Sequence, residues 1–424
     1  MLVFSGGPFR NDTNLGKTLL SLLNGFNRRQ LSQLYYGPQR PNVKACKSFY
    51  QINELQLIKS CFGLISKQCG LIINAEDVYE GNTEVETNPR FFLNRRSFIW
   101  IPILRDVLWK VSLWNSKKMK QWISAQDASV LFCTLPDTLN GCRIIMSLAK
   151  DYNLPVVIYV TDDYYVPKDE STYIARCYYH HRQKLMKELR IYVKFVIGIS
   201  DIAAKEYGDL FDAPSATIYP TANSLCTALH YNPQSTDRPV VFRYFGMLSL
   251  GRWEVLAALG HALDKINNEE QKAVLEVYSN SQEASIISAL SIGNSCIYKG
   301  WVSGDEYYKL LESTDVAVHV EAFSKEMCRM TRVSISTKIA DYLGAGKCIL
   351  AIGKESLASI QHLENVACVV HNENDLPINL QRLITDRLFR LTLQKKARML
   401  AESDHNIIAN PQTIKAILES VSRR

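Results

Sequence analysis

Short apolar runs typical of β-strands recur along this chain and alternate with helical patterns. In the first half they are Leu2–Ser5, Leu31–Tyr36, Gly70–Asn74, Ser129–Cys133, Val156–Val160 and Phe195–Ser200. In the second half they are Val240–Phe245, Val274–Tyr278, Cys296–Tyr298, Val316–Val320, Cys348–Ile352 and Ala367–Val370. Short β-branched runs separated by helices favour parallel sheets covered by helices on both faces. The chain is therefore predicted to be an α/β protein.

The chain is long enough for more than one domain. Its 424 residues, 47% of them hydrophobic, can bury two or three cores. The polar stretch from Asn223 to Arg238 is the best linker candidate. We predict two doubly wound domains, 1–230 and 236–405, followed by a C-terminal helix over 406–424 that packs back toward the first domain. Because ligands bind at the carboxyl ends of parallel strands, the two domains are expected to face each other across a binding cleft.

Composition excludes several classes of function. A net charge of +7 is modest for this length and does not indicate a nucleic-acid binder. The 11 cysteines are scattered without zinc-site spacing, which favours reduced thiols, no metal and a cytoplasmic protein. The N-terminus lacks the pattern of a signal peptide, and no apolar run is long enough to span a membrane.

Three glycine-containing loops follow predicted strands. Gly6 and Gly7 precede a helix, so the backbone there is open to close approach by a ligand. Gly246 begins a loop that ends at Arg252, where the next helix starts. A cation at a helix N-terminus is disfavoured by the helix dipole, so Arg252 indicates either an anionic partner or a solvated surface arginine. Trp301 and Val302 follow Gly300 and offer backbone groups to a flat base.

The segment from Ser334 to Leu350 predicts a loop, a short helix, a glycine turn and a buried strand. Ser336, Thr337 and Lys338 lie where the helix begins, and its unpaired N–H groups form an anion site. Asp341 lies one turn further on the same face as Lys338. A cation for phosphate and a carboxylate for ribose hydroxyls make a candidate nucleotide site; the alternative is an ordinary amphipathic helix capped by Ser336.

The order of these motifs over residues 240–355 resembles the donor-nucleotide domain of retaining GT-B glycosyltransferases of family four. The matching features are the loop ending at Arg252, the Lys-Gly-Trp-Val that contains Trp301, and the Ser-Thr-Lys-Ile-Ala-Asp-Tyr-Leu-Gly-Ala-Gly-Lys from Ser336. The first domain resembles the acceptor domain of that family through its opening Gly-Gly-Pro and a Val-Thr-Asp-Asp after the strand Val156–Val160.

The resemblance implies a role for each matching residue. Arg252 and Lys338 would bind the donor diphosphate, and Asp341, in place of the usual Glu, would hold the ribose. Trp301 and Val302 would contact the base. Further donor-binding candidates are Gly6, Gly7, Gly246, Ser336 and Thr337. The family's upstream Glu falls on Val333 here, so Glu321 or Glu326 is expected to substitute for it.

The resemblance also implies sugar transfer with retention and no essential metal, in which cations and helix N–H groups stabilise the departing diphosphate. Asp162 and Asp163 are too few ligands for a metal site. We interpret them as acceptor-facing groups or a helix-capping loop, and we take Asp163 with Glu321 as the candidate catalytic carboxylates. His180, His181 and Arg182 are interpreted as surface residues of a helix.

A basic and aromatic band extends from Arg90 to Ile123. Its only acid is Asp106. The basic members are Arg90, Arg95, Arg96, Arg105, Lys110, Lys117, Lys118 and Lys120, and the aromatic members are Phe91, Phe92, Phe98, Trp100, Trp109, Trp114 and Trp122. A helix after Pro102 would carry the apolar stripe Ile103, Val107, Val111 and Trp114. The pattern predicts contact with an anionic membrane surface; the alternative is a helix whose stripe packs inward.

The sequence thus predicts a glycosyltransferase that takes a nucleotide sugar as donor, needs no cofactor, and acts on a glycan or lipid-linked acceptor. Its predicted setting is surface polysaccharide biosynthesis, with the cytoplasmic protein peripheral on the inner face of the membrane. Two alternatives stay open: a GT-B-fold nucleotide-sugar epimerase or hydrolase, and a non-catalytic nucleotide-sugar-binding protein.

Overall fold

The computed structural model describes residues 1–61, 69–78, 100–167, 172–222 and 238–422. Two compact units divide the chain, one formed by Met1–Ile218 with Ile408–Arg424 and the other by Tyr219–Ile407. The chain therefore leaves the first unit at Ile218 and re-enters it at Ile408. Most of the predicted linker, residues 223–237, lies outside the described residues, as does part of the basic and aromatic band, residues 90–99.

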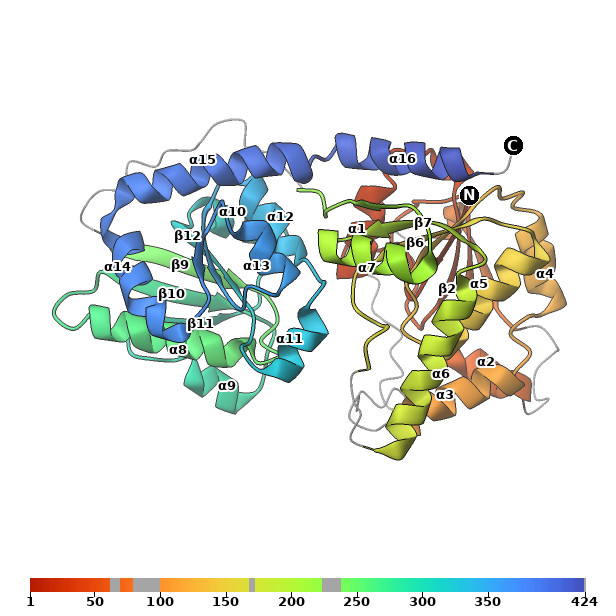
Figure 1. The fold of residues 1–424 in the computed structure, drawn as a ribbon, viewed down its shortest axis with the longest axis horizontal. Helices are drawn as coiled ribbons and strands as arrows, with labels where there is room; N and C mark the ends of the chain where they lie inside the picture. The colour runs from red at the N-terminus through yellow and green to blue at the C-terminus, as the bar shows by residue number, and fades with distance from the viewer. Residues whose placement is uncertain (62–68, 79–99, 168–171, 223–237, 423–424) are drawn as a thin grey trace. The chain divides into compact units, whose positions relative to one another are not determined.

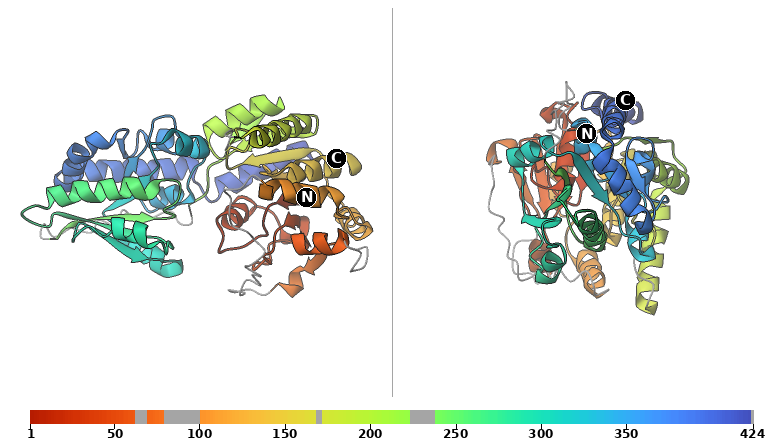
Figure 2. Two further views of the ribbon diagram at one scale, coloured as in Figure 1. Left: turned by 90° about the horizontal axis from the view of Figure 1, so that it is seen from below. Right: turned by 90° about the vertical axis from the view of Figure 1, so that its left-hand side faces the viewer.

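In its described residues, the first unit contains an eight-stranded sheet with the order β4-β3-β2-β1-β5-β6-β7-β8. The strands are β1 (Leu2–Ser5), β2 (Ser32–Tyr36), β3 (Ser48–Ile52), β4 (Leu71–Asn74), β5 (Leu131–Thr134), β6 (Val156–Val160), β7 (Val193–Gly198) and β8 (Ser215–Thr217). The helices are α1 (Asn14–Leu22), α2 (Glu54–Cys61), α3 (Trp100–Val111), α4 (Lys117–Ser124), α5 (Leu139–Asp151), α6 (Tyr173–Leu189), α7 (Asp201–Phe211) and α16 (Ala409–Val421). Figures 1 and 2 show the helices flanking the sheet.

The second unit contains a six-stranded sheet with the order β11-β10-β9-β12-β13-β14, counted over its described residues. The strands are β9 (Val240–Phe245), β10 (Ala273–Tyr278), β11 (Cys296–Gly300), β12 (Val316–Val320), β13 (Cys348–Ile352) and β14 (Cys368–Val370). The helices are α8 (Arg252–Ile266), α9 (Ala284–Ala289), α10 (Gly304–Glu312), α11 (Lys325–Thr331), α12 (Thr337–Gly344), α13 (Ala358–Leu363), α14 (Leu376–Thr385) and α15 (Arg387–Asp404). Every neighbouring pair of these strands is parallel.

The predicted strands are all present, with ends that shift by a residue or two. Two strands, β3 and β8, were not predicted, because Ser48 and Gln51 interrupt one apolar run and Ser-Ala-Thr carries almost none in the other. The sheets are parallel as predicted, except at one edge of the first sheet, where β4 pairs antiparallel with β3. An antiparallel edge strand on a parallel sheet is common, since it can follow its neighbour through a shorter connection than a crossover needs.

Local sequence explains where many helices begin. The N-cap side chains of Thr13, Thr138, Thr172, Ser200 and Ser336 each accept a hydrogen bond from a backbone N–H in the first turn. Strand residues and the helix residues that pack on them form the core of the second unit, in which Phe242 of β9, Leu259 of α8 and Leu350 of β13 are completely buried. Because both faces of the sheet are buried, the polar side chains lie in the loops that leave the ends of the strands.

Candidate nucleotide site

The candidate site lies where the strand order of the second sheet reverses. Strand β9 is followed in the chain by β10 on one side, while β12 lies on its other side. In such sheets the loops leaving the two central strands diverge and form a crevice at their carboxyl ends. The loop from Gly246 to Gly251 follows β9, and Glu321 follows β12 directly.

The β9–α8 loop has a backbone that places Arg252 at this crevice. Leu250 and Gly251 both have positive φ, 60° and 73°. A leucine in this region is uncommon and costs about 1–2 kcal/mol. A Cβ on Gly251 would lie 2.9 Å from Cβ of Ala322, so glycine is required for α8 to begin this close to the end of β12.

Arg252 and Glu321 form a buried ion pair across the crevice. One guanidinium nitrogen, Nη2, donates to both carboxylate oxygens of Glu321 at 3.0 Å each. Nε and Nη1 of Arg252 make no hydrogen bond to protein in the described part of the chain. Burial raises the pKa of Glu321, while Arg252 and the Thr331 hydroxyl oppose that rise. The arginine thus keeps two donors for an anion.

His319 is a third member of this group that the sequence did not single out. It lies two residues before Glu321 on the same face of β12, with Nε2 3.7 Å from Oε1 of Glu321. That nitrogen is buried and has no hydrogen-bond partner among the described residues. Burial, together with Arg252, lowers the pKa of His319 to about 3, so the ring is neutral. The only signal for His319 in the sequence is its position two residues before Glu321, a spacing that places two side chains on the same side of an extended segment.

The start of α12 forms a second group at the same edge of the sheet. The Ser336 hydroxyl caps the helix by accepting from the backbone N–H of Lys338, as the alternative interpretation of this segment expected. Lys338 Nζ lies 3.6 Å from the centre of the Tyr307 ring and 3.9 Å from Oδ2 of Asp341. Tyr307 donates its hydroxyl to the same oxygen of Asp341 at 3.1 Å. Asp341 is buried, so it is not a solvent-facing helical residue.

Tyr307 joins the start of α12 to the end of β9, the strand whose following loop leads to Arg252. Its ring contacts Phe245, the last residue of β9, with ring centres 5.0 Å apart, and Phe245 also contacts Tyr342 of α12. Burial, followed by the nearby Asp341, raises the pKa of Tyr307. Sequence reasoning missed Tyr307 because its contacts come from α10, β9 and α12, which are far apart in the chain. Position 333, where the family pattern has a Glu, is a completely buried valine, and Glu326 is exposed.

Trp301 and Val302 follow β11 near the other edge of the sheet. Gly300 has a φ of 80°, and the Trp301 side chain is 64% exposed. An indole that is exposed beside a strand end is available to a planar ligand. The loop after Gly300 and the Gly246 loop both lie at the carboxyl ends of parallel strands.

The remaining predicted residues belong to the first unit. Gly6 and Gly7 follow β1 at the point where that sheet reverses between β1 and β5. A Cβ on Gly7 would meet nothing within 4 Å. Across this point the Tyr36 hydroxyl donates to Asp137 at 3.3 Å. The backbone there is accessible, but these two predicted donor-binding glycines belong to a different unit from the other donor-binding candidates Gly246, Arg252, Ser336, Thr337 and Lys338.

Asp163 has a structural role in the loop after β6. Its Oδ1 accepts from the Tyr207 hydroxyl at 2.9 Å and from the backbone N–H groups of Tyr165 and Val166. The interpretation of Arg182 as a surface residue is wrong: its side chain is buried and donates to the carbonyls of Asp137 and Val166. Arg182 therefore ties the loop after β5 to the loop after β6, whereas His180 and His181 are exposed as predicted.

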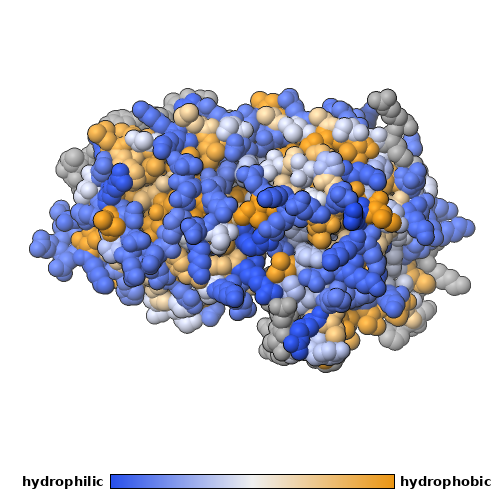
Figure 3. Space-filling model, viewed as in Figure 1, coloured by the Kyte–Doolittle hydropathy of each residue, from blue (hydrophilic) through white to orange (hydrophobic). Residues whose placement is uncertain are grey.

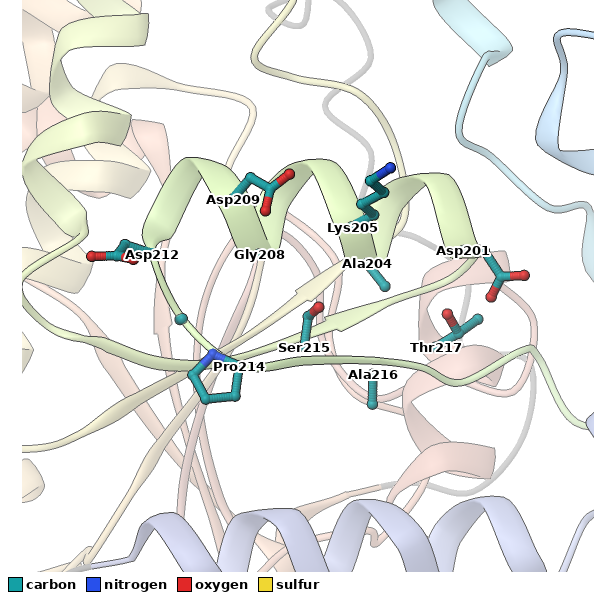
Figure 4. Close-up of a pocket in the computed structure, with 11 residues that line it drawn as sticks. Asp201, Ala204, Lys205, Gly208, Asp209, Asp212, Pro214, Ser215, Ala216 and Thr217 are labelled. Atoms are coloured by element: carbon teal, nitrogen blue, oxygen red, sulfur yellow. The ribbon is translucent and has the colours of Figure 1, made fainter.

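One hollow in the first unit lies away from all of these residues. It measures about 690 Å³ and is open on the side of α7 and the edge strand β8, with Asp201, Lys205 and Asp209 along it (Figure 4). None of the predicted site residues lines it. Its carboxylates belong to the solvated face of a surface helix.

Comparison with known proteins gives a family-model match and several similar solved structures. Residues 261–416 match the family model described as glycosyl transferase-like. Similar solved structures include an α,α-trehalose-phosphate synthase (UDP-forming) from Burkholderia vietnamiensis, with 9% identity, 99% coverage of both chains and a TM-score of 0.62. A trehalose-6-phosphate enzyme from E. coli bound with UDP-2-fluoro glucose has 12% identity, full coverage of both chains and a TM-score of 0.61. Anabaena HepE in complex with UDP-glucose has 11% identity, covers 99% of this chain and 100% of its own, and has a TM-score of 0.60.

No curated protein sequence is significantly similar to this chain. The structural matches nevertheless cover it almost completely. The protein has the GT-B fold of two Rossmann-like α/β units, each built on a largely parallel sheet. The match to the glycosyl transferase-like family model covers most of the second unit.

Proposed function

We propose that this protein is a glycosyltransferase that moves a hexosyl group from a nucleoside-diphosphate sugar to a glycan or lipid-linked acceptor. The observation that carries the proposal is the placement of Arg252, Lys338 and Asp341 at one sheet edge, beside the N-termini of α8 and α12. Anion-binding N–H groups, two cations and a buried carboxylate match a diphosphate followed by a ribose. The similar structures bound to UDP-2-fluoro glucose and UDP-glucose support it.

In this proposal the donor lies along the carboxyl edge of the second sheet. Nε and Nη1 of Arg252 and Nζ of Lys338 bind the diphosphate, and Ser336 and Thr337 supply N–H and hydroxyl groups. Asp341 accepts from the ribose hydroxyls, with Tyr307 fixing its carboxylate. Trp301 and Val302 contact the base. Sugar transfer is accelerated because these fixed positive groups stabilise the charge that develops on the departing diphosphate.

We further propose retention at the anomeric carbon and no requirement for a metal ion, as the family resemblance implies. Among the described residues, no three His, Cys, Asp or Glu side chains are grouped as metal ligands. The acceptor would bind to the first unit, near Gly6, Gly7 and the Tyr36–Asp137 pair. Surface polysaccharide assembly at the cytoplasmic face of a membrane is the proposed setting.

Helix α3 supports the proposed membrane contact. Its apolar residues Leu104, Val107 and Val111 are 65%, 52% and 64% exposed, so Val107 and Val111 of the predicted stripe face outward. Figure 3, in the view of Figure 1, shows apolar side chains where α3 lies. Lys110, Lys117 and Lys120 are exposed nearby in the chain. Exposed apolar groups with lysines suit an anionic lipid surface. Within the described residues, no helix is long and apolar enough to cross a membrane.

The experiment that tests the function has two stages. Thermal shift against a panel of UDP-, GDP- and ADP-sugars should identify one base by a rise in melting temperature. Incubation of that donor with lipid-linked and free glycan acceptors should then yield a glycosylated product with retained anomeric configuration. Release of free sugar alone would indicate the hydrolase alternative, an isomerised donor would indicate the epimerase alternative, and binding without any product would favour a non-catalytic binding protein.

A further inference from the structure

The buried group of Arg252, Glu321 and His319 has an electrostatic property that the proposed donor site does not use. Glu321 is buried and Arg252 is its counter-ion, through one guanidinium nitrogen at 3.0 Å from each carboxylate oxygen. An ionised carboxylate in such a position depends on that cation, because burial alone strongly disfavours its charge. The two groups therefore form a neutral pair in the protein without ligand.

A diphosphate would change this balance. It brings negative charge to the same arginine, while Glu321 stays within contact distance of the guanidinium. Two anionic groups sharing one buried cation repel each other, and the weaker acid is the one that takes a proton. Glu321 is that group, since the two phosphates of a nucleoside-diphosphate sugar are strongly acidic.

His319 offers a place for the incoming proton. Its Nε2 lies 3.7 Å from Oε1 of Glu321 and makes no hydrogen bond within the described residues. These two atoms need to approach by only about 0.5–1 Å to reach hydrogen-bond distance. A proton on Glu321 can then be donated to a neutral imidazole nitrogen, which also satisfies a buried acceptor.

The other groups around Glu321 do not supply this proton. They are Tyr244 on β9, Thr331 and Cys328 on α11, and Lys354 after β13. The positive charge of Lys354 lowers the pKa of Cys328 and opposes the effect of burial. Burial raises the pKa of both Tyr244 and Cys328, so both are weak acids that keep their protons at neutral pH and do not pass them to Glu321. Thr331 is a neutral hydroxyl, and the proton therefore comes from solvent.

We infer that the diphosphate of a nucleotide sugar replaces Glu321 as the counter-ion of Arg252, and that the Glu321–His319 pair takes up one proton from solvent as it does so. This inference rests on the proposed function, since it needs the donor diphosphate at Arg252. It makes Glu321 a positioning residue that holds Arg252 ready in the free protein. It also makes donor affinity depend on pH, with tighter binding at lower pH.

The test is isothermal titration calorimetry of UDP-glucose and GDP-mannose, in buffers of different ionisation enthalpy, between pH 6 and 8. Neither ligand carries a phosphate that titrates in this range, so any proton uptake belongs to the protein. The wild-type protein is expected to take up between half a proton and one proton. Its Kd should rise by up to about tenfold per pH unit over this range.

Glu321→Gln should remove the proton uptake and tighten binding about three- to tenfold, because the competing charge is gone. Glu276→Gln is the matched control: it neutralises one carboxylate of a comparable ion pair, with Arg243, in the same unit. It should leave the proton count and the Kd as in the wild type.

The outcomes separate the inference from the proposed function. Binding by the wild type without proton uptake, or weaker binding by Glu321→Gln, would overturn the inference and leave the donor site standing. Absence of binding both in calorimetry and across the thermal-shift panel of UDP-, GDP- and ADP-sugars would overturn the proposed function and the inference with it. The wild-type measurement decides the matter even if Glu321→Gln does not fold.

Discussion

Individual side chains at the carboxyl edge of the second unit's sheet account for the proposed binding of the donor. Lys338 is the clearest case, because its ammonium group is placed by Tyr307 and Asp341 rather than by solvent. Such a preorganised cation loses little side-chain entropy when it binds an anion. Asp341 therefore has two roles: it holds the ammonium group of Lys338 in place and, in the proposed function, accepts hydrogen bonds from the ribose.

Lys338→Ala should weaken nucleotide-sugar binding by about 1–3 kcal/mol, the range of a charge-assisted hydrogen bond. Lys309→Ala on α10 removes an exposed cation and is the control. Calorimetry with the donor identified by thermal shift measures both. Equal affinities for the two variants would rule out diphosphate binding by Lys338.

Asp341→Asn should lower turnover and raise the donor KM, because an amide accepts ribose hydrogen bonds less strongly than a carboxylate. The substitution should also weaken the interaction that holds the Lys338 ammonium group, because an amide carries no negative charge. The measurement is initial rates against donor concentration, with melting temperature as a check on folding. Normal kinetics in a folded variant would refute the ribose role.

Asp106 in the first unit is a third informative residue. Burial raises its pKa to about 6, although Asn140 donates to it at 2.5 Å. Because this folded-state pKa lies above the ordinary value, the group's contribution to stability is complete below pH 4 and is lost as pH rises through about 6. The loss is about 2–3 kcal/mol.

Asp106→Asn should therefore remove part of the fall in unfolding free energy between pH 4 and pH 7. Urea unfolding at the two pH values measures it, with the exposed Asp151→Asn as control. If Asp106→Asn and the wild type lose the same stability over this interval, the carboxyl group does not titrate as the burial implies.

At the scale of elements, helix α3 has one side that packs against the first unit and another side that is apolar and exposed. Asp106 and Trp109 are buried, and Trp109 contacts Tyr36 with ring centres 6.0 Å apart. Leu104, Val107 and Val111 face away from that contact and are exposed. Of the predicted stripe, Val107 and Val111 are thus exposed, while Ile103 and Trp114 are half-buried. Lys118, by contrast, donates a hydrogen bond to the backbone carbonyl of Gly70, so its ammonium group has a partner within the protein.

Replacement of Lys110, Lys117 and Lys120 by Glu should release the protein from anionic vesicles while nucleotide affinity stays unchanged. Each lysine near an anionic surface contributes about 1 kcal/mol, and salt weakens the attraction. Co-sedimentation with phosphatidylglycerol and phosphatidylcholine vesicles at two salt concentrations measures it. Lys265, Lys272 and Lys395 to Glu gives the same charge change as a control. No preference of the wild type for anionic vesicles at low salt would end the membrane proposal.

At the scale of the whole molecule, the last helix belongs to the first unit although it follows the second in the chain. Helix α16 packs against α1 and β7, with Ile414 and Leu418 buried. The first unit is thus completed by residues that come after the second. Its stability should depend on the C-terminal segment.

Ile414→Ala should destabilise the first unit by about 2–4 kcal/mol, as for other buried large-to-small substitutions. Hydrogen exchange measures it, with faster exchange expected in β7 than in β12 of the second unit. Ile378→Ala, at an exposed position of α14, should change little. Uniform acceleration in both units would show that they unfold together.

The sequence by itself determined the strands, their alternation with helices and the loops that carry the site. Apolar runs such as Val316–Val320 and Cys348–Ile352 are local signals, and so are the cap at Ser336 and the glycine loop before Arg252. Tertiary structure alone decided the pairing of Arg252 with Glu321, the place of His319 beside them, and the contact of Tyr307 with Lys338. These groups come from strands and helices up to 69 residues apart, and only the order of strands in the sheet brings them together. The outward face of α3 and the burial of Arg182 were also decided there, because a helical pattern shows which residues share a face but not what that face packs against.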